Sequence, residues 1–325
     1  MVKKITFSIF AISVFTFLLL FNSLNSKVNL TDEFIYEVKN GQTSVSVIKN
    51  LQKLNILSDN SLYLFLIKIE NKTFGNINFK TGEYLIKPGD SFLNLIKKFN
   101  NNDAFQRKIT FPEGLSNQQT FDIIESNQYL SGKITIKTKE GYLFPDTYYF
   151  SKNMPRNDLI KIMQNRTDNL LNDYWNKYNN NIPFKSKEEV LIMASIIEKE
   201  TGHTDERDLV SGVFYNRINK NMRLQSDPTV IYSITKGQYQ LNRPLSKRDL
   251  RTPSKFNTYR NRGLPPTPIA NPGYKAIYAA FNPAKTNYIY FVANGEGGHN
   301  FATNLKDHNK NVRILRKIER LRKSN

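Results

Sequence analysis

The chain begins with a long apolar run. The segment ITFSIFAISVFTFLLLF, which starts at Ile5, is almost continuously apolar, and no charged residue occurs in residues 5–26. About 20 apolar residues in a helix span the roughly 30 Å hydrocarbon core of a bilayer. The pattern therefore predicts a transmembrane helix over residues 5–25.

The residues that flank this run indicate whether it is cleaved and in which direction it crosses the membrane. A cleaved signal peptide has a shorter apolar core and a small-residue exit, whereas this exit reads NSLNSK, which favours a retained anchor over a signal peptide. Lys3 and Lys4 precede the run, and Asp32 and Glu33 follow soon after it. Because positive residues beside a membrane helix stay in the cytoplasm, we expect residues 1–4 inside and the rest of the chain outside.

Residues 34–105 are predicted to form a small α+β unit. FIYEV reads as a strand, and SVIKNLQKLNI and SLYLFLIKI read as helices. GEYLIKPGDSFLNLIKKF then reads as a strand, a Pro-Gly turn and a helix with an apolar stripe. The polar run NNND at residues 100–103 marks a boundary near residue 105.

A larger α+β domain is expected over residues 106–325, and it contains a strongly apolar helix. In SKEEVLIMASIIEKETG, Ser186 and Glu189 have the spacing of a capping box, so a helix should begin there. Nearly every residue from Val190 to Ile197 is apolar, as in a helix that is buried on all sides. The predicted fold class is thus α+β: one N-terminal transmembrane helix, a small unit and a larger domain.

Glu200 is the main candidate for a catalytic group. It continues the apolar stripe one turn beyond Ile196 and Ile197 and emerges at the end of the helix. Partial burial and the negative end of the helix dipole both disfavour a carboxylate, so its pKa should exceed the reference value of about 4.3. Such a group can donate a proton to a leaving-group oxygen near neutral pH. A solvated glutamate at a fraying helix end has the same local sequence, and Glu198 is the rival candidate.

Polar and aromatic residues beyond this helix are candidate ligands for a carbohydrate. In RLQSDPTVIY the Asp-Pro pair forces a turn, and KFNTYRNRGLPPTPIANPG and NYIYFVANGEGGHNFATN are rich in tyrosine and asparagine. The last of these segments is also predicted to form a hairpin, with a strand, a glycine-rich turn and a return strand. Aromatic faces bind sugar rings and amides bind hydroxyls, although ordinary loop composition explains each segment equally well. The predicted substrate-binding residues of these segments are Gln225, Asp227, Thr229, Tyr232, Asn257, Tyr259, Asn300 and Asn304.

Composition removes several classes of function. The chain has 47 Lys+Arg against 28 Asp+Glu, a net charge of +19 that suits an anionic polymer, an anionic lipid or a nucleic acid. The lysines are dispersed and no nucleic-acid-binding module is recognisable, so we expect no nucleic-acid partner. There is no cysteine, and the three histidines lack metal-ligand spacing, so we expect no metal site and no cofactor.

Five segments together resemble the YceG-like family of endolytic murein transglycosylases: ASIIEKETG, ERDLVSGVFYNRI, MRLQSDPTVIY, FNTYRNRGLPPTPIANPG and FNPAKTNYIYFVANGEGGHNFATN. The resemblance runs from the anchor through a LysM-like unit at 34–105 to a YceG-like catalytic domain at 106–325. It implies that the glutamate before threonine in EKET, Glu200, is the essential acid. The segment EGYLFPDTYYF also resembles the family pattern, which implies that Glu140 and Asp146 lie near the substrate groove.

The resemblance also implies a reaction. It is the non-hydrolytic cleavage of the β-1,4 bond between N-acetylmuramic acid and N-acetylglucosamine in nascent glycan strands, which leaves a 1,6-anhydro end and terminates strand elongation. Peptidoglycan strands are then the substrate, and cell-wall synthases are candidate partners. The implied location is the bacterial inner membrane, single-pass, with a cytoplasmic N-terminus and a periplasmic catalytic domain. The alternatives are a muramidase-type hydrolase at the same site and a non-catalytic envelope scaffold.

Overall fold

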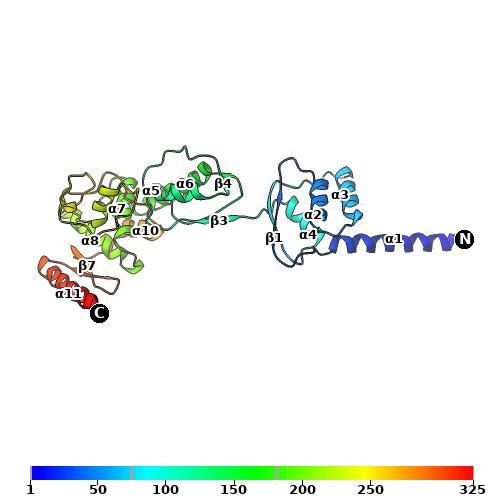
Figure 1. Ribbon diagram of the computed structural model, residues 1–325. Helices are drawn as coiled ribbons and strands as arrows, with labels where there is room; N and C mark the ends of the chain where they lie inside the picture. The colour runs from blue at the N-terminus through cyan, green and yellow to red at the C-terminus, as the bar shows by residue number, and fades with distance from the viewer. Residues whose placement is uncertain (1, 74, 76, 180–181, 325) are drawn as a thin grey trace. The chain divides into compact units, whose positions relative to one another are not determined.

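The chain divides into two compact units that each mix helices and strands (Figure 1). In the computed structural model, the described residues are 2–73, 75, 77–179 and 182–324. Met1, part of the segment 1–4 that we expect in the cytoplasm, lies outside them. Unit 1 comprises residues 1–108 and 149–152, and unit 2 comprises residues 109–148 and 153–325. The mixture of helices and strands agrees with the predicted α+β class.

Helix α1 (Val2–Asn25) contains the N-terminal apolar run. Its residues 5–25 are long and apolar enough to cross a membrane, and within this stretch only the end of the helix, at Ser23 and Leu24, is covered by other described parts of the chain. Directly beyond the helix the backbone hydrogen-bonds to the segment around residues 90–92. Phe92 N donates to Ser26 O at 3.0 Å, and Val28 N donates to Asp90 O at 2.9 Å.

Unit 1 has the predicted order of strand, two helices, strand and helix. Strands β1 (Phe34–Val38) and β2 (Gly82–Ile86) are antiparallel, and helices α2 (Ser44–Lys53) and α3 (Ser61–Thr73) lie between them in sequence. Helix α4 (Phe92–Asn100) follows, and Ser91 caps its N-terminus. The Phe99 ring packs edge-on against Tyr84, with 4.8 Å between the ring centroids. The likeness of this unit to a LysM module stays a prediction.

Unit 2 is mainly helical, and the strands from residue 107 onward form short two-stranded sheets. Strand β3 pairs with β5, β4 is parallel to β6, and β7 and β8 form the antiparallel hairpin predicted from the glycine-rich turn. The strands are β3 (Arg107–Thr110), β4 (Leu130–Ser131), β5 (Thr147–Phe150), β6 (Met154–Pro155), β7 (Tyr290–Ala293) and β8 (His299–Ala302). The helices are α5 (Asn117–Ser126), α6 (Arg156–Tyr178), α7 (Lys187–Glu200), α8 (Arg207–Asn219), α9 (Asp227–Thr235), α10 (Tyr274–Phe281) and α11 (Leu305–Ser324), with 3₁₀ turns at Thr204–Glu206 and Asp249–Arg251.

Helix α7 is the centre of the core of unit 2. Every residue from Val190 to Ile197 is buried, as predicted, and α6, α8, α9 and α10 pack around the helix (Figure 1). Ser186 Oγ caps the helix by accepting from Glu189 N at 3.3 Å. The predicted capping box is only half formed, because the Glu189 carboxylate accepts from Lys185 N instead of from Ser186 N. Because neighbouring helices fix α7 on all its faces, they also fix the position of its last residue, Glu200.

Truncating a residue of α7 should destabilise unit 2. Ile196 is 0% exposed, so Ile196→Ala should lower the free energy of unfolding by about 2–5 kcal/mol through lost burial and a cavity. The matched control is Ile162→Ala on α6, where the side chain is 44% exposed and the cost should stay within about 0.5 kcal/mol. Denaturant unfolding of the full chain in neutral detergent measures both, and equal losses would contradict the central role of α7.

Candidate active site

Glu200 is the last residue of α7 and is half-buried. Thr201 is extended, with φ −138°, and ends the helix. Burial raises the pKa of Glu200 to about 7, and the Asp227 carboxylate adds to the rise, while Ser226 and the Arg217 guanidinium oppose it. Near neutral pH the side chain is therefore present both as an acid and as a base.

The start of α9 supplies two of the groups beside Glu200. Ser226 Oγ is buried and has no hydrogen-bond partner of good geometry in the described part of the chain, yet it lies close enough to lower the pKa of Glu200. Asp227 is exposed, and its carboxylate accepts from Tyr259 Oη at 2.6 Å. Burial raises the pKa of Tyr259, and the charges of Asp227 and Glu200 add to this. The side chains of Glu200, Ser226, Asp227 and Tyr259 therefore form one group, the Glu200 cluster.

Arg217 on α8 is a cation buried beside this cluster. The residue is 7% exposed, and its guanidinium donates to neutral oxygens that include Leu224 O at 2.7 Å and Gln225 Oε1 at 3.3 Å. It also lies over the Tyr290 ring, 5.1 Å from the centroid. Because these partners carry no negative charge, the charge of Arg217 remains available to stabilise the Glu200 carboxylate.

Glu198 lies in a different, structural cluster. Its side chain is only 5% exposed, and it accepts from Gly273 N at 2.9 Å and from Arg207 Nη2 at 3.0 Å. The same Arg207 nitrogen lies 3.4 Å from a Glu113 oxygen. Gly273 precedes α10, so the carboxylate also meets the positive end of that helix. Glu198 therefore joins α7 to α8 and α10, which leaves Glu200 as the better candidate acid.

Glu140 and Tyr232 were both predicted to bind substrate, and they contact one another. The Glu140 carboxylate accepts from Asn117 N at 2.8 Å and from Tyr232 Oη at 3.2 Å. Burial raises the pKa of Glu140, and these hydrogen bonds oppose the rise. Tyr232 and Lys199 line a cavity of about 300 Å³ at the end of α7. A cavity of this size lies at the lower end of the range of ligand pockets.

Two predicted ligands are buried and make hydrogen bonds within the fold. Thr229 and Asn257 are both 0% exposed. Thr229 Oγ1 donates to Ser226 O at 2.7 Å, and Asn257 Nδ2 donates to Thr252 O at 2.8 Å. Their polar atoms are occupied within the fold, and their direct contact with substrate stays a prediction. They hold in place the loops that present Ser226 and Tyr259.

The remaining predicted ligands divide by location. Gln225 is exposed next to the Glu200 cluster, with a left-handed φ of 55°. Asp146 forms an ion pair with Arg166, and Asn300 lies on β8 opposite Val292. Asn304 caps α11, because its Oδ1 accepts from Asp307 N at 3.0 Å. Within the described residues, no hydrogen bond joins the side chain of Asp146, Asn300 or Asn304 to Glu200.

Sequence reasoning missed Ser226 and Arg217. Ser226 had the weak signal of standing directly before Asp227 in QSDPT. Arg217 had a better one, since an arginine that follows the apolar segment GVFYN within a buried helix needs internal acceptors. No pattern in the sequence identified those acceptors.

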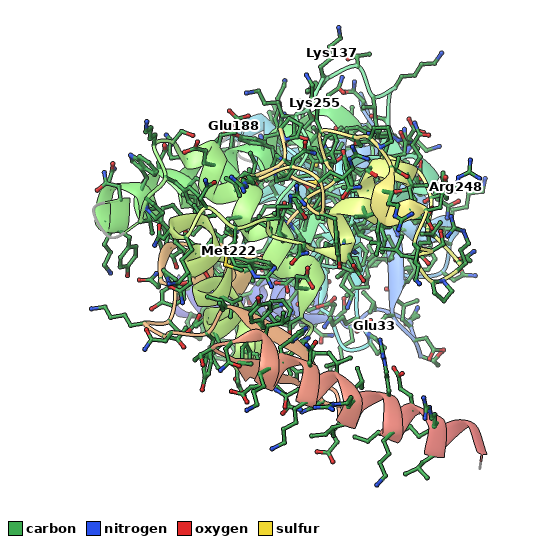
Figure 2. The ribbon with its side chains drawn as sticks, turned by 90° about the vertical axis from the view of Figure 1, so that its left-hand side faces the viewer. Glu33, Lys137, Glu188, Met222, Arg248 and Lys255 are labelled. Atoms are coloured by element: carbon green, nitrogen blue, oxygen red, sulfur yellow. The ribbon has the colours of Figure 1, made fainter. Side chains whose placement is uncertain are left out.

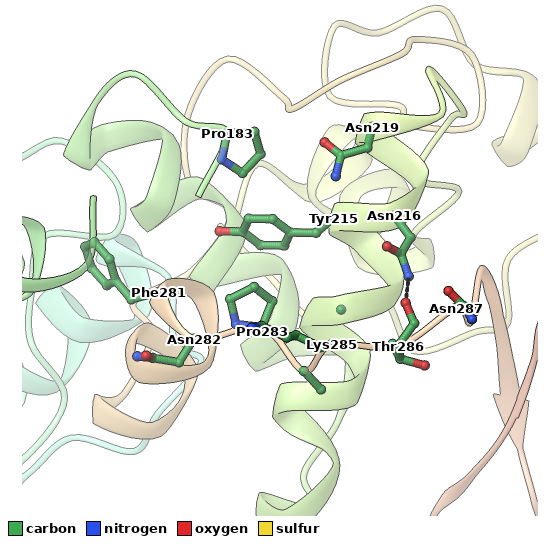
Figure 3. A pocket seen from close by; sticks show the side chains of 12 residues that line it. Pro183, Tyr215, Asn216, Asn219, Phe281, Asn282, Pro283, Lys285, Thr286 and Asn287 are labelled. Atoms are coloured by element: carbon green, nitrogen blue, oxygen red, sulfur yellow. Dashed lines mark hydrogen bonds between the residues drawn. The ribbon is translucent and has the colours of Figure 1, made fainter. Parts of the chain in front are cut away.

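A cavity of about 660 Å³ lies elsewhere in unit 2 (Figure 3). It is formed by α8 and the segment that follows α10, and Tyr215, Pro183 and Pro283 project around it in the figure. Asn216 Nδ2 closes one side by donating to Thr286 O at 2.7 Å. Its lining contains no carboxylate or histidine, so it lacks the acid or base that a glycan-cleaving site needs.

Known proteins resemble this chain in sequence. The model of the YceG-like family matches residues 36–314. A Bacillus subtilis (strain 168) protein named endolytic murein transglycosylase is 43% identical over 172 residues, which are 53% of this chain and 46% of that protein. A Streptococcus pneumoniae (serotype 2, strain D39) protein of the same name is 38% identical over 181 residues, 53% of this chain and 31% of that protein. The aligned part thus spans less than half of either relative.

A solved structure resembles the chain over more of its length. The crystal structure of a YceG-like protein from Listeria monocytogenes has a TM-score of 0.52 and 29% identity, and the likeness covers 86% of this chain and 99% of that one. Fold and site together define a two-unit α+β protein with a half-buried glutamate suited to acid–base chemistry. The chain belongs to the YceG-like family, which confirms the resemblance seen in its sequence.

The raised pKa of Glu200 predicts a pH-dependent stability. The folded pKa of about 7 exceeds the ordinary value of 4.5, so the stabilisation from this proton is complete below pH 4.5 and is lost as the pH rises through about 7. Glu200→Gln removes this titration. The melting temperature of the variant minus that of the wild type should therefore increase between pH 5 and pH 8. Glu188→Gln at the other end of α7 controls for the loss of one carboxylate, and a difference that does not change with pH would refute the assignment.

Glu198→Gln should mainly affect stability. It removes a charge from a buried ion pair and leaves Arg207 with the weaker Glu113 contact, so we expect a loss on the order of 3 kcal/mol in the free energy of unfolding. Glu188→Gln breaks an exposed pair with Lys139 and should cost at most about 1 kcal/mol. Denaturant titrations compare the two, and similar small losses would show that the Glu198 cluster does not support the fold.

Proposed function

We propose that this protein is an endolytic lytic transglycosylase. It cleaves the β-1,4 bond between N-acetylmuramic acid and N-acetylglucosamine in peptidoglycan and leaves a 1,6-anhydro end. The observation that carries the proposal is the half-buried Glu200, whose pKa of about 7 lets one side chain act first as acid and then as base. The names of the Bacillus and Streptococcus relatives support the choice of substrate.

In the proposed reaction, Glu200 alone carries the proton. The protonated side chain donates to the glycosidic oxygen, and the bond from that oxygen to the anomeric carbon of the muramic acid breaks. The Glu200 carboxylate then accepts the proton of the muramic acid C6 hydroxyl, while the C6 oxygen bonds to the anomeric carbon of the same sugar. Arg217 stabilises the carboxylate between the two steps, and the Ser226 hydroxyl supports it. No water is consumed, and Glu200 ends protonated as it began.

A muramidase-type hydrolase is the second candidate, and Asp227 is the observation that favours it. Hydrolytic glycosidases generally need a second carboxylate as nucleophile or as the base that activates water. Asp227 is exposed beside Glu200, and its negative charge raises the pKa of Glu200. The hydrogen bond from Tyr259 engages Asp227 in another role, however, which favours the route with a single carboxylate.

The same proposal extends to location and partners. Helix α1 would anchor the protein in the bacterial inner membrane, with the N-terminus in the cytoplasm and the catalytic domain (106–325) in the periplasm. There it would cut nascent strands and terminate their elongation beside the cell-wall synthases. The LysM-like unit at 34–105 would hold the glycan. A scaffold that binds glycan without cutting it would need neither the burial of Glu200 nor its raised pKa.

Substitution of the two glutamates tests the proposal. Glu200→Gln keeps the shape of the side chain but cannot cycle a proton, so turnover should fall by roughly 10² to 10⁴. Glu198→Gln, at a temperature where it remains folded, should keep most of its activity. Mass spectrometry of products from purified glycan strands supplies the readout, with melting temperatures as the folding control.

The products separate the alternatives. Anhydro ends support the transglycosylase, whereas reducing ends would establish the hydrolase. If the wild type releases neither product, the non-catalytic scaffold is the alternative that remains. Normal turnover by Glu200→Gln would show that Glu200 takes no part in the chemistry. A Glu198→Gln variant that is inactive but fully folded would show that Glu198 is the acid.

A further inference from the structure

A strongly basic pocket lies beside the Glu200 cluster. It has a volume of about 540 Å³ and is lined by Arg223, Lys247, Leu250, Arg251, Tyr259 and Arg260. Four of these six residues are cations, and none is an acid. Such a concentration of one sign of charge attracts anions.

Tyr259 connects the pocket to the candidate active site. Its ring lines the pocket, while its hydroxyl donates to Asp227 Oδ1 at 2.6 Å and its pKa responds to the charge of Glu200. Arg223 stands directly before Leu224, whose carbonyl oxygen accepts from Arg217 at 2.7 Å. The side chain of Tyr259 therefore lies between the pocket and the Glu200 cluster.

The charges of the pocket are not neutralised within the fold. The acid nearest in sequence, Asp249, is engaged by Arg243 at 2.6 Å and by Ser246 N at 2.7 Å, and these contacts hold its pKa well below the usual range. Within the described residues, no carboxylate lies within ion-pair distance of Arg223, Lys247 or Arg251.

One cation of the pocket has a structural task, and the flanking residues add further charge. Arg260 Nη1 donates to Arg251 O at 2.8 Å and so braces the wall of the pocket. Arg248 and Lys255 come from the same segment, are exposed, and project outward in Figure 2. All four cations are exposed, and Arg223, Lys247 and Arg251, which have no such bracing contact among the described residues, are the ones free to bind a ligand.

We propose that this pocket is a carboxylate-binding subsite for the acidic group carried by the lactyl substituent of the muramic acid at the cleavage site. The inference rests on the proposed function and adds to it a means of reading the substrate. The lactyl group bears either a peptide with free carboxylates or, once the peptide is removed, a carboxylate of its own. Arginine binds carboxylates through two parallel hydrogen bonds, which matches the arginine content of the pocket.

Binding measured without turnover tests the subsite. The full chain carrying Glu200→Gln, in neutral detergent, is titrated with fluorescent glycan fragments that either bear peptides or have been stripped of them. The pocket variant Arg223→Gln/Lys247→Gln/Arg251→Gln should raise Kd by about tenfold or more for at least one of the two fragments. The variant Arg223→Lys/Arg251→Lys keeps the charge but loses the paired hydrogen bonds of arginine, so it should raise Kd by more than about twofold but by less than the neutral variant does.

The matched control removes the same charge elsewhere in unit 2. Lys306, Arg313 and Arg316 on α11 are exposed and line a surface hollow of about 650 Å³, so Lys306→Gln/Arg313→Gln/Arg316→Gln should change Kd by less than about twofold. Melting temperatures show whether each variant is folded.

Each outcome decides a separate question. A loss confined to peptide-bearing fragments identifies the peptide carboxylates as the ligand, a loss confined to stripped fragments identifies the lactyl carboxylate, and a loss with both shows that the pocket accepts either. Unchanged binding, or an equal loss in the α11 control, would overturn the subsite. The proposed function fails separately, if wild-type protein releases no cleaved ends from strands that it binds.

Discussion

The burial of α7 on all its faces is the constraint on which the rest of unit 2 depends. A helix without a polar face between Val190 and Ile197 is stable only when other helices surround it. That packing brings the loops of α8, α9 and α10 to the last turn of α7. The acid, the cation beside it and the hydroxyl groups therefore come from segments that share no local sequence relationship.

The proton affinity of Glu200 is set mainly by burial, which outweighs the opposing effects of its neighbours. Burial and the neighbouring Asp227 favour the neutral acid, whereas Arg217 and Ser226 favour the anion. At Glu198 burial also raises the pKa, although the Gly273 amide and the Arg207 guanidinium, which contact the carboxylate directly, oppose the rise. Two glutamates two residues apart thus differ through their surroundings.

The sequence predicted what depends on local pattern. The apolar helix, the location of Glu200 at its end and the β7–β8 hairpin all follow from periodicity and turn residues within short segments. The candidate ligands were harder to predict, since Thr229 and Asn257 have the composition of a sugar site but are enclosed by loops distant in sequence. The half-formed capping box reflects a carboxylate that reaches one residue further back than its spacing suggested.

The bonds of Arg217 also bear on when the site comes into existence during synthesis. Its Nε donates to Ile289 O, 72 positions later in the chain. A polypeptide that emerges amino end first contains Glu200 and Arg217 well before it contains the hairpin that orients the guanidinium. Contacts between residues so far apart in sequence form late in folding. A chain that is still emerging therefore carries its acid without the surroundings that tune it, and competence arrives only with the final tenth or so of the molecule.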